Sequence, residues 1–305
     1  MTRIDIELVN KGIFESRSKA QNEIKNGIVY CNGKCVSKPS FDVNSSDIIE
    51  IKGEKLKYVS RGGLKLEKAI HEFNIDLKDK ILLDIGSSTG GFSDCAIQNG
   101  INEIYAIDVG SNQFDKRLRE NDKIHLYENT DFRNIDNTII SRCDIASIDV
   151  SFISVTKLMS KLESLNNLKE IVCLIKPQFE CGKDIADKYK GVPLNKEVHE
   201  NIILNIINSF MDIGFMIHGL TYSPIKGGNG NIEYLAYFKK DGKKEVNVSK
   251  VVSDAFRIWF LFKYHLLTFY DIKLNFNALL TISWIKYYTV NLRRKIFMEV
   301  QNEIF

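Results

Sequence analysis

The chain has 305 residues, enough for two domains of ordinary size. Hydrophobic residues make up 44% of it and charged residues 27%, a composition typical of globular proteins that excludes a disordered, collagen-like or multi-span membrane protein. The net charge is only +3, but residues 1–68 and 247–305 are both positive while the stretch between them is negative. The two ends are therefore where we expect a polyanionic partner to bind.

Features that the sequence lacks indicate the cellular compartment of the protein. Six cysteines are too few for a disulfide scaffold, and the N-terminus, MTRIDIELVNKG, has no apolar signal core. No uncharged apolar run reaches the ~18 residues of a membrane span. Cys31 and Cys35 are the only close pair of cysteines, and no histidine lies near them to complete a zinc site. We therefore predict a cytoplasmic protein with reduced thiols, no metal and no membrane partner.

Residues 1–57 are predicted to form a small α+β module. A short helix ends at Lys11-Gly12, and a second helix is capped by the Ser16 hydroxyl and ended by Gly27. The segment IVYCNGKCV alternates around Asn32-Gly33, a strong hairpin signal, and the strand DIIEIKG follows.

Basic side chains gather on the second helix and the hairpin of this module, and the candidates for RNA binding are Arg17, Lys19, Lys25, Lys34 and Lys38. Taken alone, these residues are equally compatible with a solvated surface, and the module with contact to another protein. The order RID, SRSKA, IKNGIVYCNGK and KPS, however, resembles the S4 domain, an RNA-binding module. The resemblance implies that the second helix and the hairpin hold RNA backbone.

Residues 58–79 are predicted to be a linker and a helix, SRGGLKLEKAIHEF, and residues 80–246 a methyltransferase-like domain. The strands KILLDIG, EIYAIDVG, DIASIDVS and EIVCLIKP alternate with helical segments, which predicts a doubly wound, mostly parallel α/β sheet. An amphipathic helix, HENIILNIINSFMDIGF, and an antiparallel hairpin across KGGNGN complete the domain. His199, near the start of that helix, is expected to be solvated.

Residues 247–305 are predicted to be a C-terminal extension of unknown role. Residues 256–305 hold 13 of the 32 aromatic residues and no glycine or proline. A bound helical extension and a spurious chain end both fit this composition.

The turn after the first strand of the domain, DIGSSTGGFSD, is rich in glycine and lets a ligand approach the backbone. Its G-x-x-x-G-G spacing differs from the G-x-G-x-x-G of dinucleotide sites, and the next strand ends in an aspartate suited to ribose hydroxyls. Together these features resemble the S-adenosylmethionine site of Rossmann-like methyltransferases, with an NAD site or a structural turn as alternatives. The candidate cofactor-binding residues are Asp84, Gly86, Ser88, Gly90, Gly91, Phe92, Asp108 and Asp131.

Four charged residues are expected around the same pocket: Lys65 on the lead-in helix, Asp149 and Lys176 at strand ends, and Glu233 at the start of the last strand. Methylation of an alcohol needs a base, and a lysine can act as one only when its pKa falls toward neutrality. We assign Lys176 as the base and Lys65 as its like-charged, positioning neighbour. The two carboxylates orient the ammonium groups.

This set resembles the Lys-Asp-Lys-Glu tetrad of FtsJ-type ribose 2′-O-methyltransferases. The segments SRGGLKLEKA, DIGSSTGGFSDC, DVSFIS, LIKPQFE and GGNGNIEYL resemble the TlyA family, also called haemolysin A, over residues 3 to about 257. The resemblance implies S-adenosylmethionine-dependent methylation of a cytidine 2′-hydroxyl in ribosomal RNA, with ribosomal subunits as partners. Arg61 is expected to meet an RNA phosphate.

Two features depart from the TlyA pattern. The family commonly has Asn at the position of Asp131, and residues 258–305 lie beyond the resemblance. Two other functions stay open at this point: a non-catalytic RNA-binding or ribosome-assembly factor, and a haemolysin-like membrane-active protein.

Overall fold

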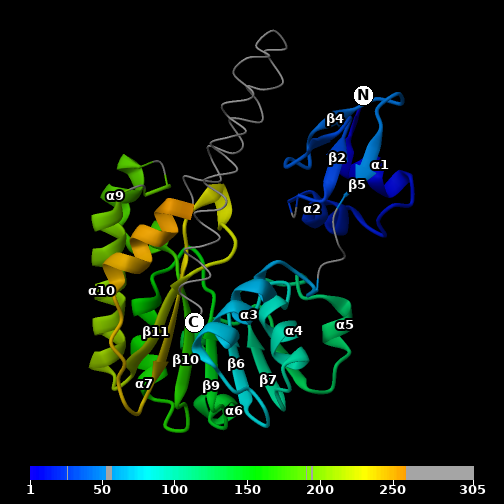
Figure 1. Ribbon diagram of the computed structural model, residues 1–305. Helices are drawn as coiled ribbons and strands as arrows, with labels where there is room; N and C mark the ends of the chain where they lie inside the picture. The colour runs from blue at the N-terminus through cyan, green and yellow to red at the C-terminus, as the bar shows by residue number, and fades with distance from the viewer. Residues whose placement is uncertain (26, 53–56, 190, 194, 259–305) are drawn as a thin grey trace, which may run out of the picture. The chain divides into compact units, whose positions relative to one another are not determined.

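The computed structural model describes residues 1–25, 27–52, 57–189, 191–193 and 195–258 (Figure 1). Asp254–Phe305 form a separate unit of the chain. The predictions for the aromatic extension beyond residue 258 therefore lie outside the described residues. No helix in the described ranges is long and apolar enough to cross a membrane.

The N-terminal module has the predicted helices and hairpin. The helices are α1 (Ile4–Asn10) and α2 (Arg17–Lys25), and the strands are β1 (Thr2–Arg3), β2 (Val29–Cys31), β3 (Lys34–Cys35), β4 (Asp42–Val43) and β5 (Ile49–Ile51). The Ser16 hydroxyl accepts a hydrogen bond from the Lys19 backbone N–H, as predicted for a helix cap. Asn32 and Gly33 have φ values of 50° and 74°, which are the values of a two-residue hairpin turn between β2 and β3.

The core of this module is small. Buried apolar side chains from α1, α2 and the three-stranded sheet pack together, among them Ile4, Leu8, Ala20, Ile24 and Val29. The pair β1–β4, which the sequence did not predict, joins the start of the chain to the segment after the hairpin.

The second part is built on a seven-stranded sheet of order β11-β12-β10-β9-β6-β7-β8. Its strands are β6 (Ile81–Ile85), β7 (Glu103–Ile107), β8 (Ile124–Tyr127), β9 (Ile145–Ile148), β10 (Glu170–Ile175), β11 (Met216–Tyr222) and β12 (Tyr234–Lys239). Strands β8, β7, β6, β9 and β10 are parallel neighbours, whereas β12 runs antiparallel to both β10 and β11. The predicted α/β fold with a closing antiparallel hairpin is confirmed.

Helices separate the strands along the chain. They are α3 (Gly62–Phe73), α4 (Gly91–Gln98), α5 (Lys116–Arg119), α6 (Asn137–Ile140), α7 (Met159–Glu163), α8 (Pro177–Glu180), α9 (Lys183–Lys188) and α10 (Lys196–Asp212). The side chain of Asn195 caps α10 by accepting from the backbone N–H groups of Glu197 and Val198.

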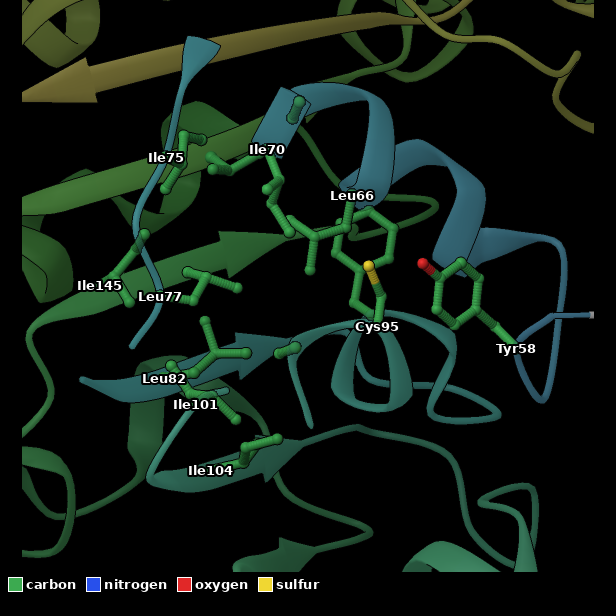
Figure 2. Packing of buried hydrophobic residues seen from close by; sticks show 14 of the residues in the cluster. Tyr58, Leu66, Ile70, Ile75, Leu77, Leu82, Cys95, Ile101, Ile104 and Ile145 are labelled. Carbon is green, nitrogen blue, oxygen red and sulfur yellow. The ribbon is translucent and has the colours of Figure 1, made fainter. Parts of the chain in front are cut away.

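Helices α3 and α4 pack against each other and cover the strands that carry the site. Leu66 and Ile70 of α3 and Cys95 of α4 meet Leu82 and Ile104 from the sheet in one buried cluster (Figure 2). Burying side chains of this size typically stabilises a fold by about 1.5–3 kcal/mol each. Because α3 begins at the predicted site, this packing fixes its position relative to the strand ends.

The expectation that His199 is solvated is wrong. Its side chain is buried at 1% exposure, with Nδ1 2.8 Å from the Tyr234 hydroxyl and Nε2 3.0 Å from the carbonyl oxygen of Pro193. Burial lowers the pKa of His199, so the neutral ring is favoured. Helical periodicity alone could not identify this inward polar residue, because its two partners come from a loop and from β12.

Candidate active site

The carboxyl ends of four neighbouring parallel strands form one edge of the sheet, and each is followed by a predicted site residue. Gly86 follows β6, Asp108 follows β7, Asp149 follows β9 and Lys176 follows β10. Two cavities of about 600 and 570 Å³ open at this edge. The two cavities share Ser151 and Phe152 in their linings, so they adjoin each other.

Three residues of the predicted charged tetrad, Lys65, Lys176 and Glu233, line the smaller cavity, and the fourth, Asp149, lines the larger one. Lys65 Nζ lies 2.7 Å from Glu233 Oε2, and Lys176 Nζ lies 2.5 Å from Asp149 Oδ1. Lys176 also donates a 2.8 Å hydrogen bond to the Ser151 hydroxyl. Lys65, Lys176 and Glu233 are each at most 8% exposed. The fold thus places two buried ion pairs, drawn from four separate segments of the chain, at one edge of the sheet.

The two lysines and two carboxylates perturb one another. Burial alone would lower the pKa of Lys65, but the negative charges of Asp149 and Glu233 raise it above its ordinary value. Burial would raise the pKa of Asp149, but Lys176 and Lys65 lower it below its ordinary value. Lys65 and Asp149 therefore stay ionised at neutral pH, in keeping with positioning roles.

Four of the predicted cofactor-binding residues line the larger cavity: Gly86, Ser88, Asp108 and Asp131. The Asp108 carboxylate accepts hydrogen bonds from the backbone N–H groups of Ser88 (2.8 Å) and Gly110 (2.7 Å), which fixes its orientation. Each of its oxygens keeps a lone pair for a ribose hydroxyl.

The cavity is shaped for a nucleoside held close to the backbone. Gly86 has φ of +84°, and a Cβ built there would lie 2.6 Å from the Asp149 carbonyl oxygen, so only glycine fits the turn. The apolar side chains of Ile107, Val109, Phe132 and Leu158 line the walls. Polar groups for a ribose and apolar walls for a purine fit S-adenosylmethionine.

The other four predicted cofactor-binding residues lie outside the cavity lining. Asp84 is fully buried, and its two carboxylate oxygens accept from the hydroxyls of Ser93 (2.6 Å) and Ser147 (2.8 Å). Gly90, at φ of +88°, packs against Leu118 and Phe114. Gly91 lies against Ser60 and Gly63, and Phe92 belongs to the core cluster. These four residues therefore support the glycine-rich turn by packing and hydrogen bonding, without lining the cavity.

Asp131 has a partner that the sequence interpretation missed. Its carboxylate caps a short 3-10 helix (Phe132–Asn134) by accepting from the Arg133 backbone N–H, and it pairs with the Arg133 guanidinium at 2.5 Å. Arg133 holds the pKa of Asp131 below its ordinary value. The negative charge of Asp131 is thus paired with a neighbouring positive charge.

Two residues of the smaller cavity were not singled out from the sequence. Phe152 is 91% exposed and has φ of +64°, an unfavourable conformation for an aromatic residue, and its ring lies 5.0 Å from that of Phe179. Gln178, on α8, lines this cavity, and its side-chain oxygen is buried. An apolar residue inside DVSFIS gives no signal of such exposure, because composition does not reveal which way a loop side chain points.

The predicted RNA-binding residues have different surroundings. Arg61 lines the smaller cavity. In the N-terminal module, Arg17 pairs with Asp5 at 3.2 Å and Lys19 pairs with Glu23 at 2.8 Å. Lys34 and Lys38 are exposed, and the Lys25 side chain lies outside the described residues.

Asp5 organises the basic face of the module. Its fully buried carboxylate accepts hydrogen bonds from Arg3 (3.0 Å), Arg17 (3.2 Å) and Gln21 (2.7 Å). Although burial opposes ionisation, these donors lower the pKa of Asp5 to about 2. Two guanidinium groups are thereby held on one face of the module.

Comparison with known proteins agrees with this geometry. Residues 58–240 match the family described as FtsJ-like methyltransferase, and residues 2–49 match the S4 domain. The 23S rRNA (cytidine-2′-O)-methyltransferase TlyA of Campylobacter jejuni is 39% identical over 251 residues, which cover 76% of this chain and 98% of that protein. YqxC of Bacillus subtilis, described as a candidate rRNA methyltransferase, is 41% identical over 263 residues, 83% of this chain and 93% of that protein.

A solved structure shares the fold. A candidate hemolysin from Streptococcus thermophilus is 37% identical to this chain and superposes with a TM-score of 0.67, covering 86% of this chain and 98% of that one. The chain therefore belongs to the FtsJ-like methyltransferases, in the group that also carries an S4 domain and includes TlyA.

Proposed function

We propose that this protein transfers the methyl group of S-adenosylmethionine to the 2′-hydroxyl of a cytidine in ribosomal RNA. The observation that carries the proposal is that Lys65, Lys176 and Glu233 line a cavity that shares Ser151 and Phe152 with the larger cavity, which is lined by Asp149 and the predicted cofactor-binding residues. The activity named for the Campylobacter jejuni relative supports the choice of cytidine and ribosomal RNA.

S-adenosylmethionine would be held by Gly86, Ser88, Asp108 and the apolar walls of the larger cavity, and when bound it supplies an electrophilic sulfonium methyl group. Asp108 would accept from the ribose hydroxyls, since its carboxylate is already oriented by two backbone N–H groups. The glycine turn lets the backbone approach the ligand closely.

Within the smaller cavity, Lys176 is the proposed base. Its Nζ would take the proton of the 2′-hydroxyl, and Asp149 would stabilise the ammonium group that results. The Ser151 hydroxyl, 2.8 Å from Nζ, fixes the direction of the amine. Lys65, kept charged by Asp149 and Glu233, is the positioning cation of the site.

The aromatic pair formed by the exposed Phe152 and the half-buried Phe179 is suited to binding a single unstacked base. RNA-modifying enzymes stack a splayed-out base on aromatic side chains, because the base faces are apolar once unstacked. Phe152 and Phe179 both line the smaller cavity, and Lys176 Nζ lies 5.9 Å from the Phe179 ring centre. We assign the pair as the platform that holds the target base while its ribose faces Lys176.

A non-catalytic RNA-binding factor is the other candidate function. It would need neither a complete tetrad nor a glycine turn shaped for a cofactor. The buried ion pairs argue against it, because burying charges in a protein interior is costly and a binding module gains nothing from them.

The test is Lys176→Met, assayed by methyl transfer to purified ribosomal subunits. Loss of a general base lowers rates by about 100- to 10,000-fold. Because the substitution also leaves Asp149 without its cation, retained binding of S-adenosylmethionine by the variant is the check that the site still folds. Lys80→Met is the matched control, since Lys80 pairs with Glu170 at the opposite end of the sheet. Transfer by Lys176→Met at the unsubstituted rate would contradict the mechanism.

A further inference from the structure

The carboxylate of Glu180 links α8 to the loop that follows β9. Its Oε1 atom accepts a 2.8 Å hydrogen bond from the backbone N–H of Val155, and its Oε2 atom accepts a 2.5 Å hydrogen bond from the Ser154 hydroxyl. Both partners are donors, and a carboxylate offers an acceptor oxygen to each of them. Burial raises the pKa of Glu180, and no lysine or arginine in the described ranges pairs with it to offset that cost. A polar link that is kept despite this cost points to a role for the loop it holds.

Phe152, in the middle of this loop, has an unfavourable backbone conformation, with φ of +64°. It makes no hydrogen bond to any residue that the structure describes. A conformation of this kind persists only where the neighbouring structure imposes it. The hydrogen bond from Lys176 to the Ser151 hydroxyl holds the loop before Phe152, and the two hydrogen bonds to Glu180 hold it after Phe152.

The helix that carries Glu180 also carries the ring that Phe152 meets. Phe179 immediately precedes Glu180, and its ring centroid lies 5.0 Å from that of Phe152, with the ring planes inclined by 49°. The backbone N–H of Phe179 donates a 2.9 Å hydrogen bond to the carbonyl oxygen of Lys176, the residue that follows β10. The contacts of Glu180 therefore set the position of Phe152 relative to both Phe179 and Lys176.

We propose that Glu180 is a positioning residue for the target base: by holding the loop after β9, it keeps the Phe152 ring beside Phe179, where the base stacks. The inference rests on the proposed function, because the two rings matter to catalysis only if a base binds on them. Glu180 lines neither of the two cavities, so its effect on the reaction passes through Phe152.

A double-mutant cycle on methyl transfer to purified ribosomal subunits tests this inference. Stacking of one base on an aromatic side chain contributes about 5- to 150-fold in affinity, so Phe152→Ala should lower kcat/KM for the RNA by a factor in that range. Glu180→Ala should also lower it. In the Phe152→Ala background, however, Glu180→Ala should add a further loss of less than about twofold, because the ring that it positions is gone. Glu180→Gln keeps one acceptor oxygen and should recover part of the activity.

Asp144→Ala is the matched control. Asp144 precedes β9, the strand that the loop follows, and its carboxylate accepts a 3.0 Å hydrogen bond from the backbone N–H of Ile81 at the opposite end of the sheet. Any loss that it causes should therefore multiply with the loss caused by Phe152→Ala. Rates are expressed per site that binds S-adenosylmethionine in a calorimetric titration, so partial unfolding of a variant does not imitate a loss of positioning.

The inference is overturned if the losses from Glu180→Ala and Phe152→Ala multiply, or if either single variant keeps the unsubstituted kcat/KM; both results leave methyl transfer itself intact. If Glu180→Ala does not fold, Ser154→Ala, which removes the hydroxyl that Glu180 accepts from, goes through the same cycle. No methyl transfer by the unsubstituted protein would overturn the proposed function, and this inference with it.

Discussion

At the scale of single residues, the buried carboxyl of Asp84 makes the stability of the protein depend on pH. Burial raises its pKa from 3.8 to about 6, against the opposing hydrogen bonds from Ser93 and Ser147. Between about pH 4 and 6 the folded state therefore binds more protons than the unfolded state, and this group's contribution to stability falls as the pH rises.

Asp84→Asn should remove that dependence. Relative to this variant, the unsubstituted protein should lose roughly 3 kcal/mol of unfolding free energy between about pH 4 and 7. Urea unfolding at several pH values measures the difference, and comparison with the variant cancels the contributions of other carboxylates. A difference that stays constant with pH would show that Asp84 is ionised at no cost, contrary to this account.

Some residues of the site could be predicted from the sequence and others could not, and the difference has a physical cause. Asp108, Asp149 and Lys176 could be predicted because each follows a strand whose β-branched, apolar pattern is plain in the sequence. Phe152 could not, because its importance comes from an exposed ring, whose direction depends on the path of a loop. Asp84 stands near the end of a similar apolar run, but it lies inside β6, and its carboxylate is buried against the hydroxyls of Ser93 and Ser147.

At the scale of elements, the turn between β6 and α4 depends on Gly86. Gly100, after α4, offers a matched comparison: its φ is +85°, but the nearest atom to an added Cβ is 3.9 Å away. Gly86 has nearly the same φ, with the Asp149 carbonyl oxygen 2.6 Å from the added Cβ. Substitution at Gly100 therefore tests backbone strain alone, whereas substitution at Gly86 adds a collision between the new Cβ and the Asp149 carbonyl oxygen.

Gly100→Ala should cost about 1–2 kcal/mol of stability through its left-handed backbone alone and leave S-adenosylmethionine affinity unchanged. Gly86→Ala should cost more, and it should also weaken S-adenosylmethionine binding because Asp149 and its strand end have to move. Thermal unfolding and calorimetric titration provide the two readouts. Equal cofactor affinity in both variants would show that the close approach at Gly86 has no bearing on the cofactor cavity.

Elements with strong local signals were predictable, and those that depend on distant pairing were not. The Asn32-Gly33 turn and the Asn195-capped helix α10 rest on interactions within a few residues. By contrast, β1 and β4 are two residues long and pair across 39 to 41 positions of sequence, so neither has a periodicity of its own.

At the scale of the whole molecule, the S4 module carries basic side chains of its own, in addition to those that line the smaller cavity. Arg17 and Lys19 are already paired with Asp5 and Glu23, whereas Lys34 and Lys38 form no ion pair with a described residue. Neutralising the unpaired lysines should therefore affect RNA binding most, because their full charge is available to release counterions from phosphates.

The double variant Lys34→Gln/Lys38→Gln should weaken RNA binding and reduce the slope of log affinity against log salt by about 1–2. Lys11→Gln/Lys52→Gln removes the same charge from lysines already paired with Glu7 and Glu50, and should change the slope less. Titrations of a ribosomal RNA fragment at several salt concentrations measure both. Equal slopes for the two double variants would place the RNA contact elsewhere.

The central claim is ribose methylation, and one measurement tests it most directly. Purified small and large ribosomal subunits are incubated with the full-length protein and S-adenosylmethionine labelled in its methyl group, and the label is mapped on each RNA. The account predicts label on the 2′-oxygen of a cytidine. Label on a base atom, or no label on either subunit from protein that binds S-adenosylmethionine, would contradict it.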